Sequence, residues 1–120
     1  MFHCNIFKEA KSNSYFRKVL ATAQFSQVVL MSLLPKEEIG AETHKLDQIL
    51  VFVHGSGKAV LNGKEYAIAE GDLFLVPAGT AHNFVNTGND ALKLFTVYAP
   101  PAHKEGVVRK TKKEAEEVPE

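Results

Sequence analysis

The sequence has little that would tie the protein to an oxidising compartment, a nucleic acid or a membrane. Its single cysteine, Cys4, cannot form a disulfide within the chain, so we expect a cytoplasmic protein. Fourteen basic and 14 acidic residues cancel to zero net charge, which is unlike the basic surface of nucleic-acid-binding domains. No apolar run approaches the roughly 20 residues that span a bilayer, and residues 1–11 lack the pattern of a secretory signal. We therefore expect neither nucleic acid nor membrane as a partner.

Short runs rich in β-branched and aromatic residues recur along the chain between turn residues. Eight or nine short strands at this spacing predict an all-β sandwich or barrel. With 120 residues, we expect one domain over 1–120, with the barrel at about 15–100. Residues 101–120 are expected to form a charged, solvated tail with at most a short helix. The predicted strands are residues 15–21, 25–34, 48–53, 58–61, 65–69, 73–76, 82–86 and 91–99.

Two dipeptides predict tight turns between these strands. Asn62-Gly63 is the strongest hairpin signal, because a type I′ turn needs positive φ at both central residues. Gly71-Asp72 predicts a second turn, since glycine accepts positive φ and aspartate bonds back to the nearby backbone. Pro77 then ends the apolar run at 73–76, because proline cannot donate to a sheet ladder.

The segment from Gly71 to Asn86 reads GDLFLVPAGTAHNFVN, with His82 three residues after Gly79. This spacing of glycines, proline, histidine and asparagine resembles the second motif of the cupin family. The resemblance implies a double-stranded β-helix, the jelly-roll barrel of that family. It also implies that His82 is a metal ligand.

An upstream stretch is similar to the first cupin motif, which is usually His-x-His, then three or four residues, Glu, six residues and Gly. Glu42 stands at the first histidine position, His44 at the second and Gln48 at the glutamate position, with Gly55 after six further residues. Lys36 stands where that motif has an early glycine. The resemblance implies that Glu42, His44, Gln48 and His82 hold one metal ion, although two of the four positions differ from the usual residue.

The spacing of these residues is compatible with one site. Glu42 and His44 leave the same face of an extended strand, while His82 arrives from a distant strand. Two imidazoles, one carboxylate and one amide oxygen suit one divalent ion, which could be zinc, iron, manganese, nickel or cobalt. Four protein ligands leave one or two coordination positions for water or substrate.

Other interpretations of these residues stay open. Glu42 also fits a solvated acidic stretch with Glu37 and Glu38, and the Gln48 amide also fits a hydrogen bond to a bound molecule. Asp47 competes for the role of Gln48, but strand alternation would point the two to opposite faces. The remaining histidines lie at a strand end or near the termini and are expected outside the site: His54, His3 and His103.

Residues 48–53 are apolar on both faces of the predicted strand. Leu50 and Phe52 share the face of Gln48, whereas Ile49 and Val51 occupy the other. A strand that is apolar on both faces is covered on both. A chain of this size has few residues for a third layer, so we expect a homodimer.

Three functions fit this site. Small cupins that look like this chain are described as phosphomannose isomerase-like, which implies a metal-dependent isomerase of a sugar or sugar phosphate. A metal-dependent dioxygenase and a non-catalytic small-molecule sensor are the alternatives, because one fold hosts many activities. No general base stands out except Lys45, Tyr98, or Glu42 where it is not a ligand. A small polar molecule is the expected partner in all three.

Overall fold

The structure is a computed structural model that describes residues 1–118. In this part of the chain nine strands form two antiparallel sheets, as predicted for a jelly-roll barrel. The larger sheet has the strand order β6-β3-β8-β2-β1-β9 and the smaller has the order β5-β4-β7. The elements are α1 Ile6–Ser12, β1 Arg17–Thr22, β2 Gln27–Leu33, β3 Asp47–His54, β4 Gly57–Leu61, β5 Lys64–Ile68, β6 Leu73–Val76, β7 His82–Asn86, β8 Leu92–Ala99, β9 Val108–Arg109 and α2 Lys112–Glu117.

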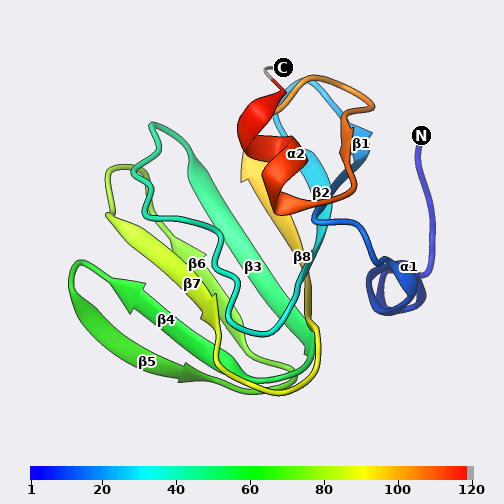
Figure 1. The fold of residues 1–120 in the computed structure, drawn as a ribbon. Helices are drawn as coiled ribbons and strands as arrows, with labels where there is room; N and C mark the ends of the chain where they lie inside the picture. Colours follow the sequence, from blue (N-terminus) through cyan, green and yellow to red (C-terminus); the bar gives the residue numbers. More distant parts are fainter. Residues whose placement is uncertain (119–120) are drawn as a thin grey trace.

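The two sheets face each other and enclose the core (Figure 1). Because side chains alternate along a strand, β3 sends Leu50 and Phe52 inward, where both are fully buried. Phe84 of β7 meets them from the small sheet, with its ring centroid 5.6 Å from that of Phe52. Leu50, Phe52 and Phe84 therefore belong to one buried apolar cluster between the sheets.

Both predicted turns are present. Asn62 and Gly63 have φ of 50° and 80° and join β4 to β5, with Leu61 paired to Lys64. At the second turn Gly71 has φ of 92°, and the Asp72 carboxylate accepts a hydrogen bond of 2.8 Å from the Ala69 amide. Positive φ at these positions is the physical reason for the glycines.

The segment 36–44 runs beside β7 as an irregular fourth strand of the small sheet. Glu42 and His82 exchange two backbone hydrogen bonds of 2.9 Å, and Ile39 donates to the Phe84 carbonyl. Farther along, Gly79 donates to the His44 carbonyl at 2.8 Å. These bonds bring the two cupin-like motifs side by side, although they are about 40 residues apart in sequence.

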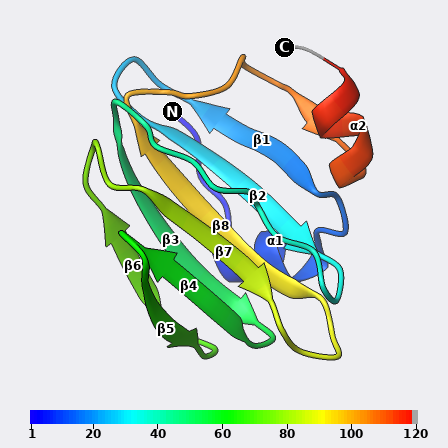
Figure 2. The same cartoon turned by 60° about the vertical axis from the view of Figure 1, so that its left-hand side comes forward.

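The outer face of the large sheet carries a helix that the sequence analysis did not predict. Asn5 caps α1 by accepting a hydrogen bond from the Lys8 amide, and the helix packs with Ala10 against Leu30 and Val53. Figures 1 and 2 show α1 on the side of the large sheet that faces away from the small one. Part of the apolar face that was expected to need a second subunit is therefore covered within the chain.

The C-terminal segment also departs from the prediction. β9 pairs with β1, and Val107 and Ala115 pack against the core. The expectation of a solvated tail at 101–120 is therefore wrong for these residues, because a few apolar side chains among the charges suffice to dock the segment. The expected short helix is present as α2, capped by the Thr111 hydroxyl. The last two positions of the predicted tail lie outside the described residues.

None of the helices within residues 1–118 has the length and apolar character needed to cross a membrane.

Candidate metal centre

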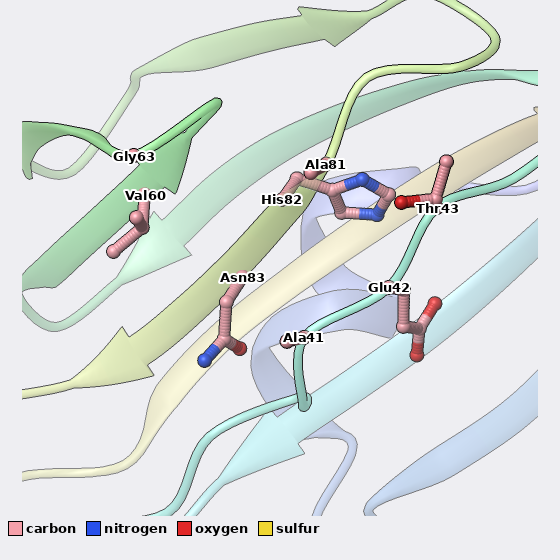
Figure 3. Close-up of a pocket in the computed structure, with 8 residues that line it drawn as sticks. All are labelled: Ala41, Glu42, Thr43, Val60, Gly63, Ala81, His82 and Asn83. Atoms are coloured by element: carbon pink, nitrogen blue, oxygen red, sulfur yellow. The ribbon is translucent and has the colours of Figure 1, made fainter.

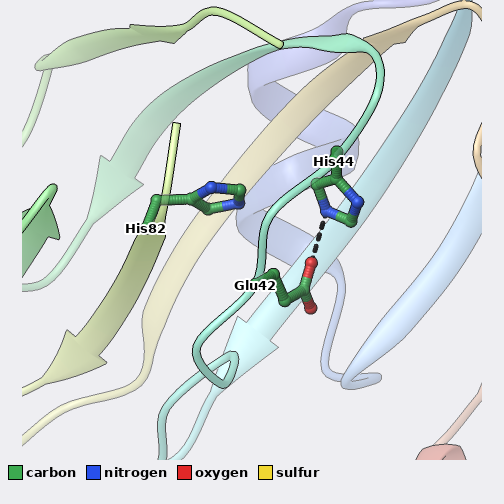
Figure 4. A group of neighbouring side chains, drawn as sticks. All are labelled: Glu42, His44 and His82. Atoms are coloured by element: carbon green, nitrogen blue, oxygen red, sulfur yellow. Dashed lines mark ion pairs between the residues drawn. The ribbon is translucent and has the colours of Figure 1, made fainter. Parts of the chain in front are cut away.

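Three of the four predicted ligands meet at one place between the sheets. Glu42, His44 and His82 each offer a ligand atom, and these atoms all lie within 4.8 Å of one another. Figure 4 shows the two imidazoles and the carboxylate pointing toward a common centre, from β7 on one side and the segment 36–44 on the other. Carboxylate and imidazole are ligands that zinc and other divalent transition metals accept.

His82 is held rigidly on β7. Its side chain is buried, and Nδ1 lies 2.8 Å from the Thr80 carbonyl oxygen. A carbonyl can only accept, so Nδ1 carries the proton and Nε2 carries the lone pair. Nε2 is buried and has no hydrogen-bond partner in the described structure. This tautomer is the one needed for metal binding through Nε2.

Glu42 and His44 lie outside the regular strands and are more exposed. Their side chains are 30% and 26% exposed, and His44 Nε2 contacts Glu42 Oε2 as an ion pair (Figure 4). The two rings of His44 and His82 lie 5.2 Å apart between centroids. The predicted same-face arrangement of Glu42 and His44 is present.

Gln48 reaches the interior from β3 and is 3% exposed. The Thr96 hydroxyl donates to the Ile49 carbonyl at 2.8 Å and accepts from Gln48 Nε2 at 3.1 Å. The hydroxyl hydrogen is already used in the bond to Ile49, so the hydroxyl can only accept from Gln48. The NH₂ end of the Gln48 amide must therefore face Thr96. Gln48 Oε1 is left buried and without a hydrogen-bond partner in the described structure. The carbonyl end of this amide is therefore available for a further interaction.

A cavity of about 270 Å³ adjoins His82 and Glu42 on the side of the β4–β5 turn. Figure 3 shows that the His82 ring and the Asn83 amide leave neighbouring positions of β7 in different directions. Asn83 accepts a hydrogen bond from the Gly40 amide at 2.9 Å. The cavity is large enough only for a small molecule, since typical ligand pockets measure roughly 300–1,000 Å³. Its lining residues are Ala41, Glu42, Thr43, Val60, Gly63, Ala81, His82 and Asn83.

The competing residues lie elsewhere. Asp47 is exposed and accepts a hydrogen bond from the Ala78 amide, so it braces a loop. His3 and His54 are exposed, as expected. His103 is half-buried and packs on Tyr98, whose ring in turn packs on His44.

Sequence reasoning missed the residues that support the ligands. Thr80 and Thr96 orient His82 and Gln48 through the bonds described above, and neither was named. Strand alternation gives a signal for Thr96, which shares the inward face of β8 with Leu94 and Tyr98. No signal in the sequence distinguishes Thr80 from other loop residues, because its backbone carbonyl makes the contact.

Asn86, the last residue of the second motif, has a structural role. It is 1% exposed, and its Nδ2 donates to the Leu33 and Asp90 carbonyls at 2.9 Å each. Its Oδ1 accepts from the Gly88 amide at 2.9 Å. The asparagine therefore joins β7 to the end of β2 and to the turn before β8.

A family model described as "Cupin domain" matches residues 29–98, which include all four proposed ligands. This chain belongs to the cupin family. An uncharacterized protein of Bacillus subtilis (strain 168), YrkC, is 43% identical over 122 residues, which cover 95% of this chain and 65% of that protein. This cupin thus spans just under two thirds of that relative.

Solved structures give the same result for the fold. The crystal structure of BH2720 from Bacillus halodurans matches with a TM-score of 0.95 and 40% identity, covering 98% of this cupin and 94% of that chain. A predicted oxalate decarboxylase from Thermotoga maritima matches with a TM-score of 0.60 and 29% identity, covering 62% of this cupin and 66% of that chain. The predicted family and fold are confirmed.

Proposed function

We propose that this cupin binds one divalent transition metal ion through Glu42, His44, Gln48 and His82. The ion would be zinc, iron, manganese, nickel or cobalt, because the donor set of two imidazoles, a carboxylate and an amide oxygen suits all of them. The coordination positions that the four residues leave open would take a small polar molecule.

One observation carries this proposal: two buried ligand atoms have neither a hydrogen bond nor an ion-pair contact in the described residues. His82 Nε2 and Gln48 Oε1 are each oriented by a bond to the opposite end of the same side chain. Leaving a buried polar atom unpaired costs about 1–3 kcal/mol, and a metal ion would satisfy both atoms at once. A site that served stability alone would pair them within the protein.

A bound ion would supply Lewis-acid polarisation of a substrate oxygen. The chain's own residues supply orientation and exclusion of water. Thr80 and Thr96 hold His82 and Gln48, and Phe84 packs beside the His82 ring at 6.1 Å between centroids. Glu42 and His44, which are partly exposed, stand on the side from which a molecule in solution would reach the centre.

We propose metal-dependent chemistry on a small polar molecule, of which a sugar or sugar-phosphate isomerase is the leading form. The structural relative described as a predicted oxalate decarboxylase favours the broader class, a reaction of a small molecule. Dioxygenase chemistry and a non-catalytic sensor are the alternatives, and the metal decides between them. Zinc would disfavour oxygenase chemistry, iron would favour it, and a protein without affinity for metal would be a binding module.

The test is elemental analysis of the purified protein, followed by titration of the metal-free protein with Zn²⁺, Mn²⁺ and Co²⁺ in a calorimeter. We expect one ion per chain, and loss of binding in His82→Ala. A wild-type protein that takes up none of these ions would contradict the proposal.

We further propose that the cupin is a homodimer, with a cytoplasmic location as expected from its single cysteine. Leu73 and Leu75 of β6 are 60% and 58% exposed on the outer face of the large sheet. They pair with Val51 and Ile49 of β3, beyond the area that α1 covers. An exposed, contiguous apolar face marks an interface. In a dimer with a two-fold axis, this face of one copy packs against the same face of the other.

This proposal is tested by light scattering at micromolar concentration. The wild type should have the mass of a dimer, and Leu75→Glu should have that of a monomer, because a charge in a buried interface is costly. Tyr66→Glu is the matched control, since Tyr66 is exposed on the small sheet. A monomeric wild type would contradict the assignment.

A further inference from the structure

Four aromatic rings form a continuous row from the candidate metal centre to the C-terminal segment. The His82 and His44 centroids lie 5.2 Å apart, those of His44 and Tyr98 lie 6.0 Å apart, and those of Tyr98 and His103 lie 5.2 Å apart. The Tyr98 ring is nearly perpendicular to both neighbours, at 88° and 81°. Edge-to-face geometry at this spacing is attractive for aromatic pairs.

The two histidines of the centre are supported differently. The Thr80 carbonyl fixes the ring of His82 through Nδ1. His44 has no such bond in the described residues, and its side chain contacts Glu42 and the rings of His82 and Tyr98. Glu42 and His82 are themselves proposed ligands, so Tyr98 is the ring contact from outside the ligand set that orients His44.

Tyr98 is itself held firmly. It is 3% exposed, and its neighbours across the sheet are Gln27 on β2 and Gln48 on β3. Gln27, which is 1% exposed, clamps the backbone of His103: Nε2 donates to the His103 carbonyl at 2.7 Å, and Oε1 accepts from the His103 amide at 3.0 Å. This clamp fixes the backbone of His103, whose ring packs on Tyr98.

We propose that Tyr98 is a positioning residue that holds the His44 imidazole for metal binding, and that His103, clamped by Gln27, braces Tyr98. The C-terminal segment after β8 would then belong to the metal centre, although it contributes no ligand. This inference rests on the proposed metal binding by the chain.

The test is titration of metal-free protein with Co²⁺, followed by calorimetry and by the visible absorption of the bound ion. Tyr98→Leu should weaken Co²⁺ affinity about three- to tenfold and change the spectrum, since aromatic pairs of this kind contribute that much. Tyr98→Phe keeps the ring and should stay within about twofold of the wild type. His103→Ala should have a smaller effect in the same direction as Tyr98→Leu. Phe74→Leu is the control, because Phe74 packs on Phe52 and Phe84 instead.

A double-mutant cycle shows whether Tyr98 acts through His44. In a His44→Ala background, Tyr98→Leu should no longer change Co²⁺ affinity. An equal loss in both backgrounds would overturn the proposal, and so would a loss in Tyr98→Phe as large as in Tyr98→Leu. If the wild type binds Co²⁺ and Tyr98→Leu binds it with the same affinity, this inference alone is overturned. If the wild type binds no metal, the proposed function is overturned as well.

Discussion

Each end of β7 carries one buried polar side chain, and the two differ in how fully their polar atoms are hydrogen-bonded. Asn86 has hydrogen bonds at both ends of its amide, to Leu33, Asp90 and Gly88. His82, four residues earlier on the same inward face, has one nitrogen bonded and the other buried without a partner in the described structure. The satisfied end stabilises the fold and the unsatisfied end is available for chemistry, so one motif serves both purposes.

The substitution His82→Ala tests the difference between the two ends of β7 with the largest expected effect. We expect metal affinity to fall by a factor of about 100 or more, since even the loss of an outer-shell partner costs about 10- to 100-fold. The metal-free protein should stay folded, because the apolar layers between the sheets hold it. Calorimetric titration and thermal melting measure the two quantities. Val85→Ala, on the outer side of the same strand, is the control, and an unchanged affinity in His82→Ala would refute the assignment.

Asn86→Ala should have the opposite profile. Three hydrogen bonds at about 1 kcal/mol each are lost, so we expect the free energy of unfolding to fall by about 2–3 kcal/mol and the melting temperature by roughly 10 °C. Metal affinity should stay within about twofold of the wild type. Urea denaturation gives the first value and Co²⁺ titration the second. A large loss of affinity in a folded Asn86→Ala protein would show that the two ends of β7 are not separable.

Gln48→Ala should be milder than His82→Ala. We expect a loss of metal affinity of about tenfold, because an amide oxygen is a weaker ligand than an imidazole. Thr96→Val, which removes the group that orients the amide, should reduce affinity less than Gln48→Ala does. Titration of both variants with Zn²⁺ measures the two losses of affinity and shows which is larger. A Gln48→Ala protein as impaired as His82→Ala would instead make Gln48 a principal ligand.

The smallest effect is expected at Lys36, whose amide donates to the Asn86 carbonyl at 3.1 Å. Lys36 has φ of 72°, a conformation that costs a non-glycine residue roughly 1–2 kcal/mol. Lys36→Gly should raise the free energy of unfolding by at most about 1 kcal/mol, after the greater entropy of unfolded glycine is subtracted. Lys36→Ala, which keeps the strain, should show no gain. Metal affinity should not change in either variant, because the stabilising end of β7 alone is affected.

The C-terminal segment and α1 show where sequence reasoning reached its limit. The strands and hairpin turns were predicted to within a few residues, because period-2 alternation and the positive φ of Asn62-Gly63 are local properties. Docking of α1 depends on Leu30 and Val53, and docking of the C-terminal segment depends on β1 and Gln27. Those surfaces exist only once distant strands have assembled, so the short flanking sequences carry no sufficient signal of their own.

The sequence by itself determined the family, the strand order along the chain, and the spacing that puts Glu42 and His44 on one face. These follow from alternation, turn chemistry and two short motifs, each of which acts over a few residues. The tertiary structure alone decided that Thr96 turns the Gln48 carbonyl away from itself and that Tyr98 packs on His44. Each of these is a contact between segments far apart in sequence, and its geometry depends on the register of strands that no local pattern encodes.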